Sequence, residues 1–183
     1  MRQIVRMTLE NDKSMDIELY DDVAPISVKN FLKLVDEGFY SGIVFHRIIK
    51  DFMAQAGGYL VSDNNIDYAK ECDNIKGEFK SNGVENNLKH KKGVISMART
   101  SIKDSASSQF FICTADAPHL DGEYAAFGKV VDGFDTLEFL NDARTINVGG
   151  GLTDFPYPII RIKKIERVWY DKNPWSTYSF IIF

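Results

Sequence analysis

The sequence predicts a mainly β protein, either a barrel or a sandwich, with two helices. Three observations support this prediction. Apolar and polar residues alternate near the N-terminus, short apolar runs broken by Gly, Asn, Asp and Ser fill residues 43–131, and two segments repeat apolar residues at helical spacing. The chain has 183 residues, which is the length of one ordinary domain and is enough to bury a core without disulfides.

The first element is a predicted β-hairpin. Two segments alternate apolar and polar residues, and Asn11, Asp12 and Lys13 between them favour a turn. Because alternate residues of a strand share one face, the hairpin has one face to bury. That face carries Val5, Met7, Leu9, Met15, Ile17 and Leu19.

A helix is predicted next. Pro25 suits the first helical turn, and Gly38 suits the position just past the helix end. The apolar residues between them fall at i, i+3, i+4 and i+7 and form one stripe, which consists of Val28, Phe31, Leu32 and Val35.

The middle of the chain predicts several short strands, at residues 43–49, 94–98, 110–113 and 125–131. Asp121 and Gly122 favour a tight turn between two of them. Residues 59–92 are polar and irregular, which is typical of a long surface excursion.

The last part of the chain predicts a short helix and a final strand. The helix covers residues 134–141, with Phe134 and Leu137 facing inward. Ile160 and Ile162 then alternate, but Ile165 breaks the phase, which a β-bulge would explain. We expect one domain over residues 1–170, with the apolar tail 171–183 packed on it, because large exposed apolar patches are rare in monomers. A partner or oligomer contact is the alternative for the tail.

Composition argues against several functions. The net charge of −4 gives no reason to expect a nucleic-acid partner, and the basic run at residues 89–92 is interpreted as a solvated turn. The two cysteines, Cys72 and Cys113, form no CxxC motif, and the three histidines show no metal-ligand spacing. The N-terminus lacks the apolar core of a signal peptide, and no apolar run could span a bilayer. We therefore expect a reduced, cytoplasmic protein with no cofactor, metal or membrane partner.

Three segments together resemble the cyclophilin family. They are APISVKNFLKLVDEGFY at residues 24–40, FHRIIKDFMAQAGG at residues 45–58, and GVISMARTSIKDSASSQFFICTADAPHLDGEYAAFGKVVDG at residues 93–133. The FHR, FMxQ, QFFI, LDG and FGKV motifs occur in the order and spacing of the family, and the match covers roughly residues 4–168. The MART and APHLDG motifs look like those of bacterial cyclophilins. The resemblance implies a closed eight-stranded antiparallel β-barrel capped by two α-helices.

The resemblance also implies an activity, peptidyl-prolyl cis-trans isomerisation, and a site. Arg47 would be the catalytic residue, and Phe52, Met53, Phe111 and Leu120 would line an apolar pocket for the proline ring. Gln55 would bind the substrate backbone and help orient Arg47. The groove for residues before proline would be formed by Ala98, Arg99, Thr100 and Gln109, and the rim by His119 and Tyr124.

The chain departs from the common family pattern at several positions. Many members carry Trp in place of His119, Asn-Ala in place of Arg99-Thr100, and His in place of Tyr124, while Ala56 stands where Gly is usual. Because an indole donor is missing at position 119, we expect cyclosporin-type inhibitors to bind, if at all, more weakly than to the best family binders.

Two other functions compete with this interpretation. The implied substrates are proline-containing peptides and unfolded or loop segments of proteins, but the same groove could hold such segments without turnover, as a binding module. Arg47, Phe52, Gln55 and Phe111 favour the enzyme. A serine hydrolase has little support, because Ser107 and Ser108 lack a G-x-S-x-G elbow. His46 is interpreted as structural, since rotation about a bond needs no base.

Overall fold

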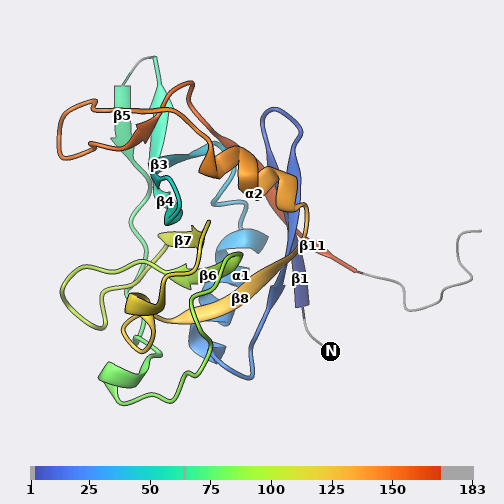
Figure 1. The fold of residues 1–183 in the computed structure, drawn as a ribbon, viewed down its shortest axis with the longest axis vertical. Helices are drawn as coiled ribbons and strands as arrows, with labels where there is room; N and C mark the ends of the chain where they lie inside the picture. Colours follow the sequence, from blue (N-terminus) through green and yellow to red (C-terminus); the bar gives the residue numbers. More distant parts are fainter. Residues whose placement is uncertain (1–2, 64, 170–183) are drawn as a thin grey trace, which may run out of the picture.

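In the computed structural model, which describes residues 3–63 and 65–169, nine strands form one antiparallel sheet with two helices (Figure 1). The strand order is β11-β1-β2-β8-β6-β7-β4-β3, and β5 pairs with β4 off this path. The sheet strands are β1 (Gln3–Leu9), β2 (Ser14–Leu19), β3 (Ile43–Ile49), β4 (Met53–Ser62), β5 (Asn65–Tyr68), β6 (Val94–Met97), β7 (Phe110–Cys113), β8 (Ala126–Asp132) and β11 (Ile162–Val168). The other elements are α1 (Pro25–Asp36), α2 (Phe134–Asn141), the 3-10 turns η1 (Lys80–Asn82) and η2 (Pro118–Leu120), and a small second sheet of β9 (Thr145–Ile146) and β10 (Phe155–Pro156).

The predicted hairpin is confirmed. β1 and β2 pair in antiparallel register, with Met7 opposite Met15, and Asp12 takes a positive φ of 63° in the turn. The predicted bulge near Ile165 is also confirmed, because the β1–β11 register shifts between Thr8 and Leu9. Ile165 thereby turns its side chain into the core beside Met7.

Helix α1 begins at Pro25 and is followed by Gly38 at a φ of +68°, as predicted. Its N-cap residue supplies no side-chain cap; the carboxylate of Glu78 caps the helix from a distant loop. This carboxylate accepts hydrogen bonds from the backbone N–H groups of Ile26 and Ser27, at 2.9 and 2.8 Å, and from the Ser27 hydroxyl at 2.7 Å. Because Glu78 is itself buried, these bonds tie the loop to the helix.

Helix α2 has the predicted bounds, but one of its predicted core residues is wrong. Leu137 is fully buried, whereas Phe134 is 42% exposed. Phe134 is the first residue of the helix, and Thr136, Leu140 and Asn141 complete the buried face instead.

The sheet is open and strongly curled, so the prediction of a closed eight-stranded barrel is wrong. The terminal strands of the sheet, β11 and β3, form no ladder with each other. Only a single bridge, between Val44 and Arg161, joins β3 to the segment before β11. Backbone bonds from Gly42 N to Ile162 O and from Phe45 N to Ile160 O flank that bridge, and they hold the edges near each other without continuous pairing.

Residues 59–92 are more regular than predicted. β4 continues to Ser62, and β5 pairs with its second half, with Tyr59 opposite Tyr68. The remainder of the segment does run along the surface, with the single turn η1 as its only helical element among the described residues.

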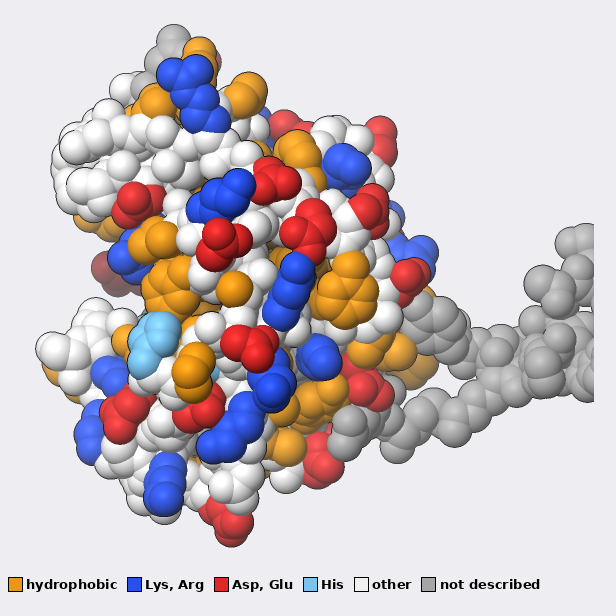
Figure 2. Space-filling view, in the orientation of Figure 1, with side chains coloured by type: hydrophobic (Ala, Val, Ile, Leu, Met, Phe, Trp, Pro, Cys, Tyr) orange, Lys and Arg blue, Asp and Glu red, His pale blue; other side chains and the backbone are white. Residues whose placement is uncertain are grey.

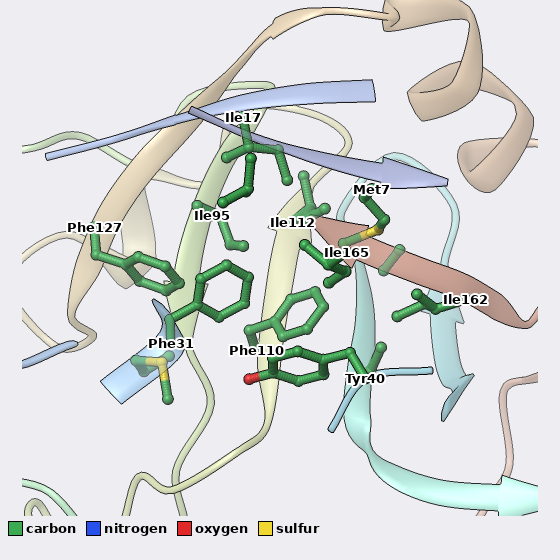
Figure 3. Close-up of a cluster of buried hydrophobic side chains, with 14 of the residues drawn as sticks. Met7, Ile17, Phe31, Tyr40, Ile95, Phe110, Ile112, Phe127, Ile162 and Ile165 are labelled. Atoms are coloured by element: carbon green, nitrogen blue, oxygen red, sulfur yellow. The ribbon is translucent and has the colours of Figure 1, made fainter. Parts of the chain in front are cut away.

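The main core lies inside the curled sheet, against α1 (Figure 3). Phe31 of α1 meets three other rings, with centroid distances of 5.2 Å to Tyr40, 5.6 Å to Phe110 and 5.3 Å to Phe127. Aromatic pairs at such distances add to the free energy gained by burying apolar area. The sheet is therefore fixed in its curl by rings that come from the helix and from β7 and β8.

The basic run at residues 89–92 forms ion pairs with nearby acidic residues. Lys89 contacts Asp121, Lys91 contacts Asp116 and Lys92 contacts Glu138. No helix within the described residues is long and apolar enough to cross a membrane. The tail 171–183, whose packing was predicted, lies outside the described residues.

Candidate active site

A row of side chains crosses four strands on the outer face of the sheet. Arg47 on β3 lies opposite Gln55 on β4, Gln55 lies opposite Phe111 on β7, and Phe111 lies opposite Ser96 on β6. Residues directly opposite each other in an antiparallel sheet project from the same side. Residues from the flanking positions, such as Ala54, belong to the main core on the other side.

A β-bulge turns Arg47 to this outer face. Phe45 lies opposite Ala56 and is buried in the core, and strict alternation would send Arg47 to the core as well. The register shifts between Phe45 and Arg47, so that two residues of β3 span a single step of β4. The extra residue reverses the alternation, and Arg47 reaches the surface with its side chain 48% exposed.

Beside this row lies a second hydrophobic cluster, separate from the main core. Its buried members are Met53, Phe111, Cys113, Ala117 and Leu120, and Ile49, Phe52, Ala98 and Tyr124 pack against them. A cavity of about 210 Å³ opens above it, lined by Arg47, Phe52, Met53, Gln55, Ala98, Arg99, Phe111, Leu120 and Tyr124. Figure 2 shows this face hollowed on its left side, where hydrophobic side chains gather next to a histidine.

An acidic side chain accompanies Arg47. The Oδ2 atom of Asp154 lies 3.8 Å from Arg47 Nε, and the backbone oxygen of Asp154 accepts a hydrogen bond from Ile48 N at 2.9 Å. Thr153 donates its hydroxyl to the same Oδ2 atom at 2.9 Å. The backbone of Asp154 is thus anchored to β3 at the residue after the arginine, and its carboxylate lies beside Arg47.

Close backbone packing sets the position of Gln109 beside Gln55. The Gln55 side-chain amide donates to Gln109 Oε1 at 3.0 Å. Gly57, at a φ of +102°, allows the backbones to approach, since a Cβ there would lie 2.5 Å from Ser108 O. A Cβ on Gly58 would similarly meet the side chain of Gln109.

A buried histidine supports the ring of Phe111 from below. His90 stacks on Phe111 at a centroid distance of 6.0 Å and an angle of 18°. Its Nδ1 lies 3.1 Å from Asp121 Oδ1 and its Nε2 3.1 Å from Ser96 Oγ. Because a carboxylate only accepts, Nδ1 carries the proton and Nε2 accepts from the serine hydroxyl. Burial lowers the pKa of His90, which keeps the ring neutral.

The residues Ser96, His90 and Asp121 are thus in contact in the order of a hydrolase triad. Ser96 is fully buried, so its hydroxyl cannot reach a substrate, and the three residues form a support for Phe111. No local pattern in the sequence indicates this group, because its members lie on three separate segments.

His46 is buried beside Arg47, in agreement with its interpretation as structural. Its ring lies 4.6 Å from that of Tyr59, and Nδ1 has no hydrogen-bond partner among the described residues. Burial, together with the charge of Arg47, lowers the pKa of His46 from 6.5 to about 4. His46 is therefore neutral at physiological pH.

The structure brings most of the predicted site residues to one cavity. Nine of them line it, and three lie outside its lining. Of these three, Gln109 is hydrogen-bonded to Gln55, and His119 lies with its ring 5.2 Å from that of Phe52. Thr100 is exposed and bonds to the Ser105 hydroxyl. Within the described residues, no group of three His, Cys, Asp or Glu side chains is placed to hold a metal ion.

Comparisons with known proteins agree with this fold. Residues 4–167 match the family described as cyclophilin type peptidyl-prolyl cis-trans isomerase/CLD. The chain is 44% identical over 143 residues to peptidyl-prolyl cis-trans isomerase A of Dickeya dadantii, a match covering 74% of this chain and 70% of that protein. It is 42% identical over 159 residues to peptidyl-prolyl cis-trans isomerase 10 of Caenorhabditis elegans, with 86% and 89% covered.

Solved structures show the same arrangement. The crystal structure of a cyclophilin type peptidyl-prolyl cis-trans isomerase from Cryptosporidium parvum matches with a TM-score of 0.76 and 28% identity, over 93% of this chain and 100% of that one. A structure of the same protein in the presence of the dipeptide Ala-Pro matches with a TM-score of 0.74 and 30% identity, over 92% and 100%.

The curled antiparallel sheet, the two helices and these matches define a cyclophilin-type domain. The chain belongs to the cyclophilin-type peptidyl-prolyl cis-trans isomerase family. The predictions of the family, of the isomerase function and of an enzyme are confirmed.

Proposed function

We propose that the cavity on the outer face is the active site and that Arg47 is its catalytic residue. Rotation about the bond before proline has a barrier of about 18–20 kcal/mol, because resonance gives that bond partial double-bond character. No covalent bond is made or broken, so the enzyme needs only to bind the twisted amide more tightly than the planar one.

An arginine donor suits this task. In the twisted amide the nitrogen lone pair is no longer shared with the carbonyl, and it becomes a better hydrogen-bond acceptor. A fixed donor aimed at this nitrogen stabilises the transition state selectively. The guanidinium is planar, rich in donors and always charged, so it can serve without any change of protonation.

The surroundings of Arg47 support the proposal. The bulge in β3 turns the side chain to the cavity, and the nearest carboxylate oxygen, on Asp154, lies beside Nε. Among the described residues neither terminal Nη group has a hydrogen-bond partner, so both are available to a substrate. This outward-turned arginine in a cavity with an apolar wall is the observation that carries the proposal.

The apolar wall of the cavity would hold the proline ring while the rest of the substrate turns. Phe52, Met53, Phe111 and Leu120 supply that wall. Gln55 would bind the substrate backbone. The residues before proline would pass Ala98, Arg99, Thr100 and Gln109, with His119 and Tyr124 at the rim. The dipeptide Ala-Pro, in whose presence a structure of the Cryptosporidium parvum protein was determined, contains the Xaa-Pro bond of these proposed substrates.

We further propose proline-containing peptides and unfolded or loop segments of proteins as substrates, and assistance to protein folding as the outcome, since uncatalysed prolyl isomerisation is a slow folding step. The unpaired thiols of Cys72 and Cys113 suit a reducing compartment such as the cytoplasm. Because His119 offers no indole N–H, cyclosporin should inhibit weakly, and nanomolar inhibition in a peptide assay would contradict this.

An assay of a short Xaa-Pro peptide tests the proposed function. The unmodified protein should accelerate isomerisation, and Arg47→Ala should lower kcat/KM by about 100-fold, which corresponds to about 2.7 kcal/mol of transition-state stabilisation. Arg167→Ala is the matched control, because Arg167 binds Asp36 and Gln3 beside α1 and does not line the cavity. No acceleration by the unmodified protein, or equal activity of both variants, would overturn the proposal.

A further inference from the structure

Arg99 lies at the edge of the active-site cavity, but its guanidinium is bound to the protein itself. Nε and Nη2 donate to the backbone oxygen of Glu123 at 3.1 and 2.9 Å, and Nη1 donates to the backbone oxygen of Thr100 at 2.9 Å. The side chain is only 12% exposed. Each of the three guanidinium nitrogens therefore already has an acceptor.

Two aromatic rings also contact this guanidinium. Its central carbon lies 5.0 Å from the centroid of Phe79 and 4.6 Å from that of Tyr124. Phe79 belongs to the main core, whereas Tyr124 packs against the second cluster and meets Phe111 edge-on, at 5.7 Å and 85°. Arg99 thus connects the main core to the ring that walls the cavity.

We infer that Arg99 is a positioning residue that fixes Tyr124, and thereby the width of the cavity, and that it does not recognise a charged group of the substrate. The inference rests on the proposed role of the cavity in holding proline. It follows from geometry, because the planar fork of arginine can bond two carbonyls and stack on rings together. A lysine ammonium keeps the charge but cannot make this set of contacts.

The role of Arg99 determines which substrates its loss affects. If Arg99 fixes Tyr124, loss of the guanidinium loosens Tyr124 at the rim and, through the edge-on ring contact, the Phe111 side of the wall that would hold every proline ring. Binding of all Xaa-Pro peptides should then weaken by the same factor. If Arg99 were instead a recognition cation, its loss would weaken only peptides with an acidic residue before proline, and lysine would substitute for it.

The test compares Arg99→Lys and Arg99→Met on two peptides that differ only in Glu or Gln before proline. Dissociation constants come from NMR titration, and the isomerisation rate of bound peptide comes from exchange spectroscopy. Both variants should raise both dissociation constants by about five- to tenfold, as expected for the loss of the one cation–π contact that positions Tyr124 at the cavity. The rate of the bound peptide should stay within about twofold, because Arg47 is untouched.

The control is Arg167→Lys. Arg167 also donates two hydrogen bonds, to the Asp36 carboxylate, but it lies away from the cavity, so both dissociation constants should stay unchanged. In the unmodified protein, contacts between the Tyr124 and Phe111 rings should give nuclear Overhauser effects that weaken in both Arg99 variants. Three results would overturn the inference: weaker binding of the Glu peptide alone, unweakened binding in Arg99→Lys, or unchanged dissociation constants in both variants. The unmodified protein's own turnover tests the proposed function separately, so the two can fail independently.

Discussion

His46 and Arg47 are neighbours in β3, and one bulge gives them opposite environments. Arg47 reaches the surface, while His46 is enclosed beside Tyr59 with its pKa lowered to about 4 by burial. A neutral, enclosed imidazole is no general base for a substrate in the cavity. The bulge therefore separates Arg47, the donor of the proposed mechanism, from His46, which cannot act as a base there.

The lowered pKa of His46 predicts acid-sensitive stability. Its ordinary value is 6.5 and its folded value is about 4, so the unfolded chain binds a proton more readily than the folded protein. The free energy of unfolding should therefore fall as the pH drops from about 6.5 to about 4, by about 3 kcal/mol from this group. The lowered pKa of His90 acts in the same direction.

Urea unfolding of the unmodified protein and of His46→Phe, at several pH values, measures this effect. The variant should lose a smaller part of its stability on acidification, because only the contribution of His90 and of the acidic groups remains. If the free energy of unfolding of the two proteins depended equally on pH, protonation of His46 would make no contribution to acid sensitivity.

Among the elements, helix α1 depends on a carboxylate that is distant in the sequence. Glu78 accepts from two backbone N–H groups at the helix start and from the Ser27 hydroxyl, and it is buried. Its removal leaves those donors without a partner at the positive end of the helix dipole.

We expect Glu78→Ala to lower the free energy of unfolding by about 2–3 kcal/mol, since buried donors left unpaired carry a desolvation cost. Glu85→Ala is the control, because Glu85 is exposed and, among the described residues, accepts a hydrogen bond from the Asn87 side chain alone. Thermal unfolding compares the two variants. Equal melting temperatures would mean that water satisfies the N–H groups at the start of α1 as well as Glu78 does.

Local patterns in the sequence predicted most elements well. The hairpin, α1 and α2 depend on periodicities of two and 3.6 residues, which are visible without any tertiary contact. β5 was missed because the alternation of Asn65–Tyr68 covers only four residues within a polar segment, and the strand forms by pairing with β4. The closed barrel, which the family resemblance implied, was wrong because a single bridge between Val44 and Arg161, and no ladder, joins the β3 edge to the segment before β11.

Some residues of the candidate site could be predicted from the sequence, and others could not. Arg47 and the cavity-lining residues lie within motifs, so resemblance located them. Asp154, and the His90 group beneath Phe111, were missed, because Asp154 comes from a loop more than a hundred residues after Arg47. Arg99 was expected to line the groove and does line the cavity, but its bonds to Glu123 and Thr100 are visible only in the fold.

At the scale of the whole molecule, the aromatic cluster around Phe31 holds the curled sheet on which the site is built. Phe31→Ala should lower the free energy of unfolding by about 3–5 kcal/mol, because a large cavity forms among well-packed rings. Phe134→Ala, which truncates a half-exposed ring of α2, should cost far less. Equal losses in chemical denaturation would contradict the placement of the core.

The curled sheet, the bulge and the two clusters together place Arg47, the proposed donor, in one cavity with an apolar wall. Exchange spectroscopy of a bound Xaa-Pro peptide tests this claim most directly, since it separates binding from rotation. The account predicts that Arg47→Ala still binds the peptide with a dissociation constant within about threefold, while the bound cis-trans exchange slows by about 100-fold. Unchanged exchange in the bound state of Arg47→Ala would contradict it.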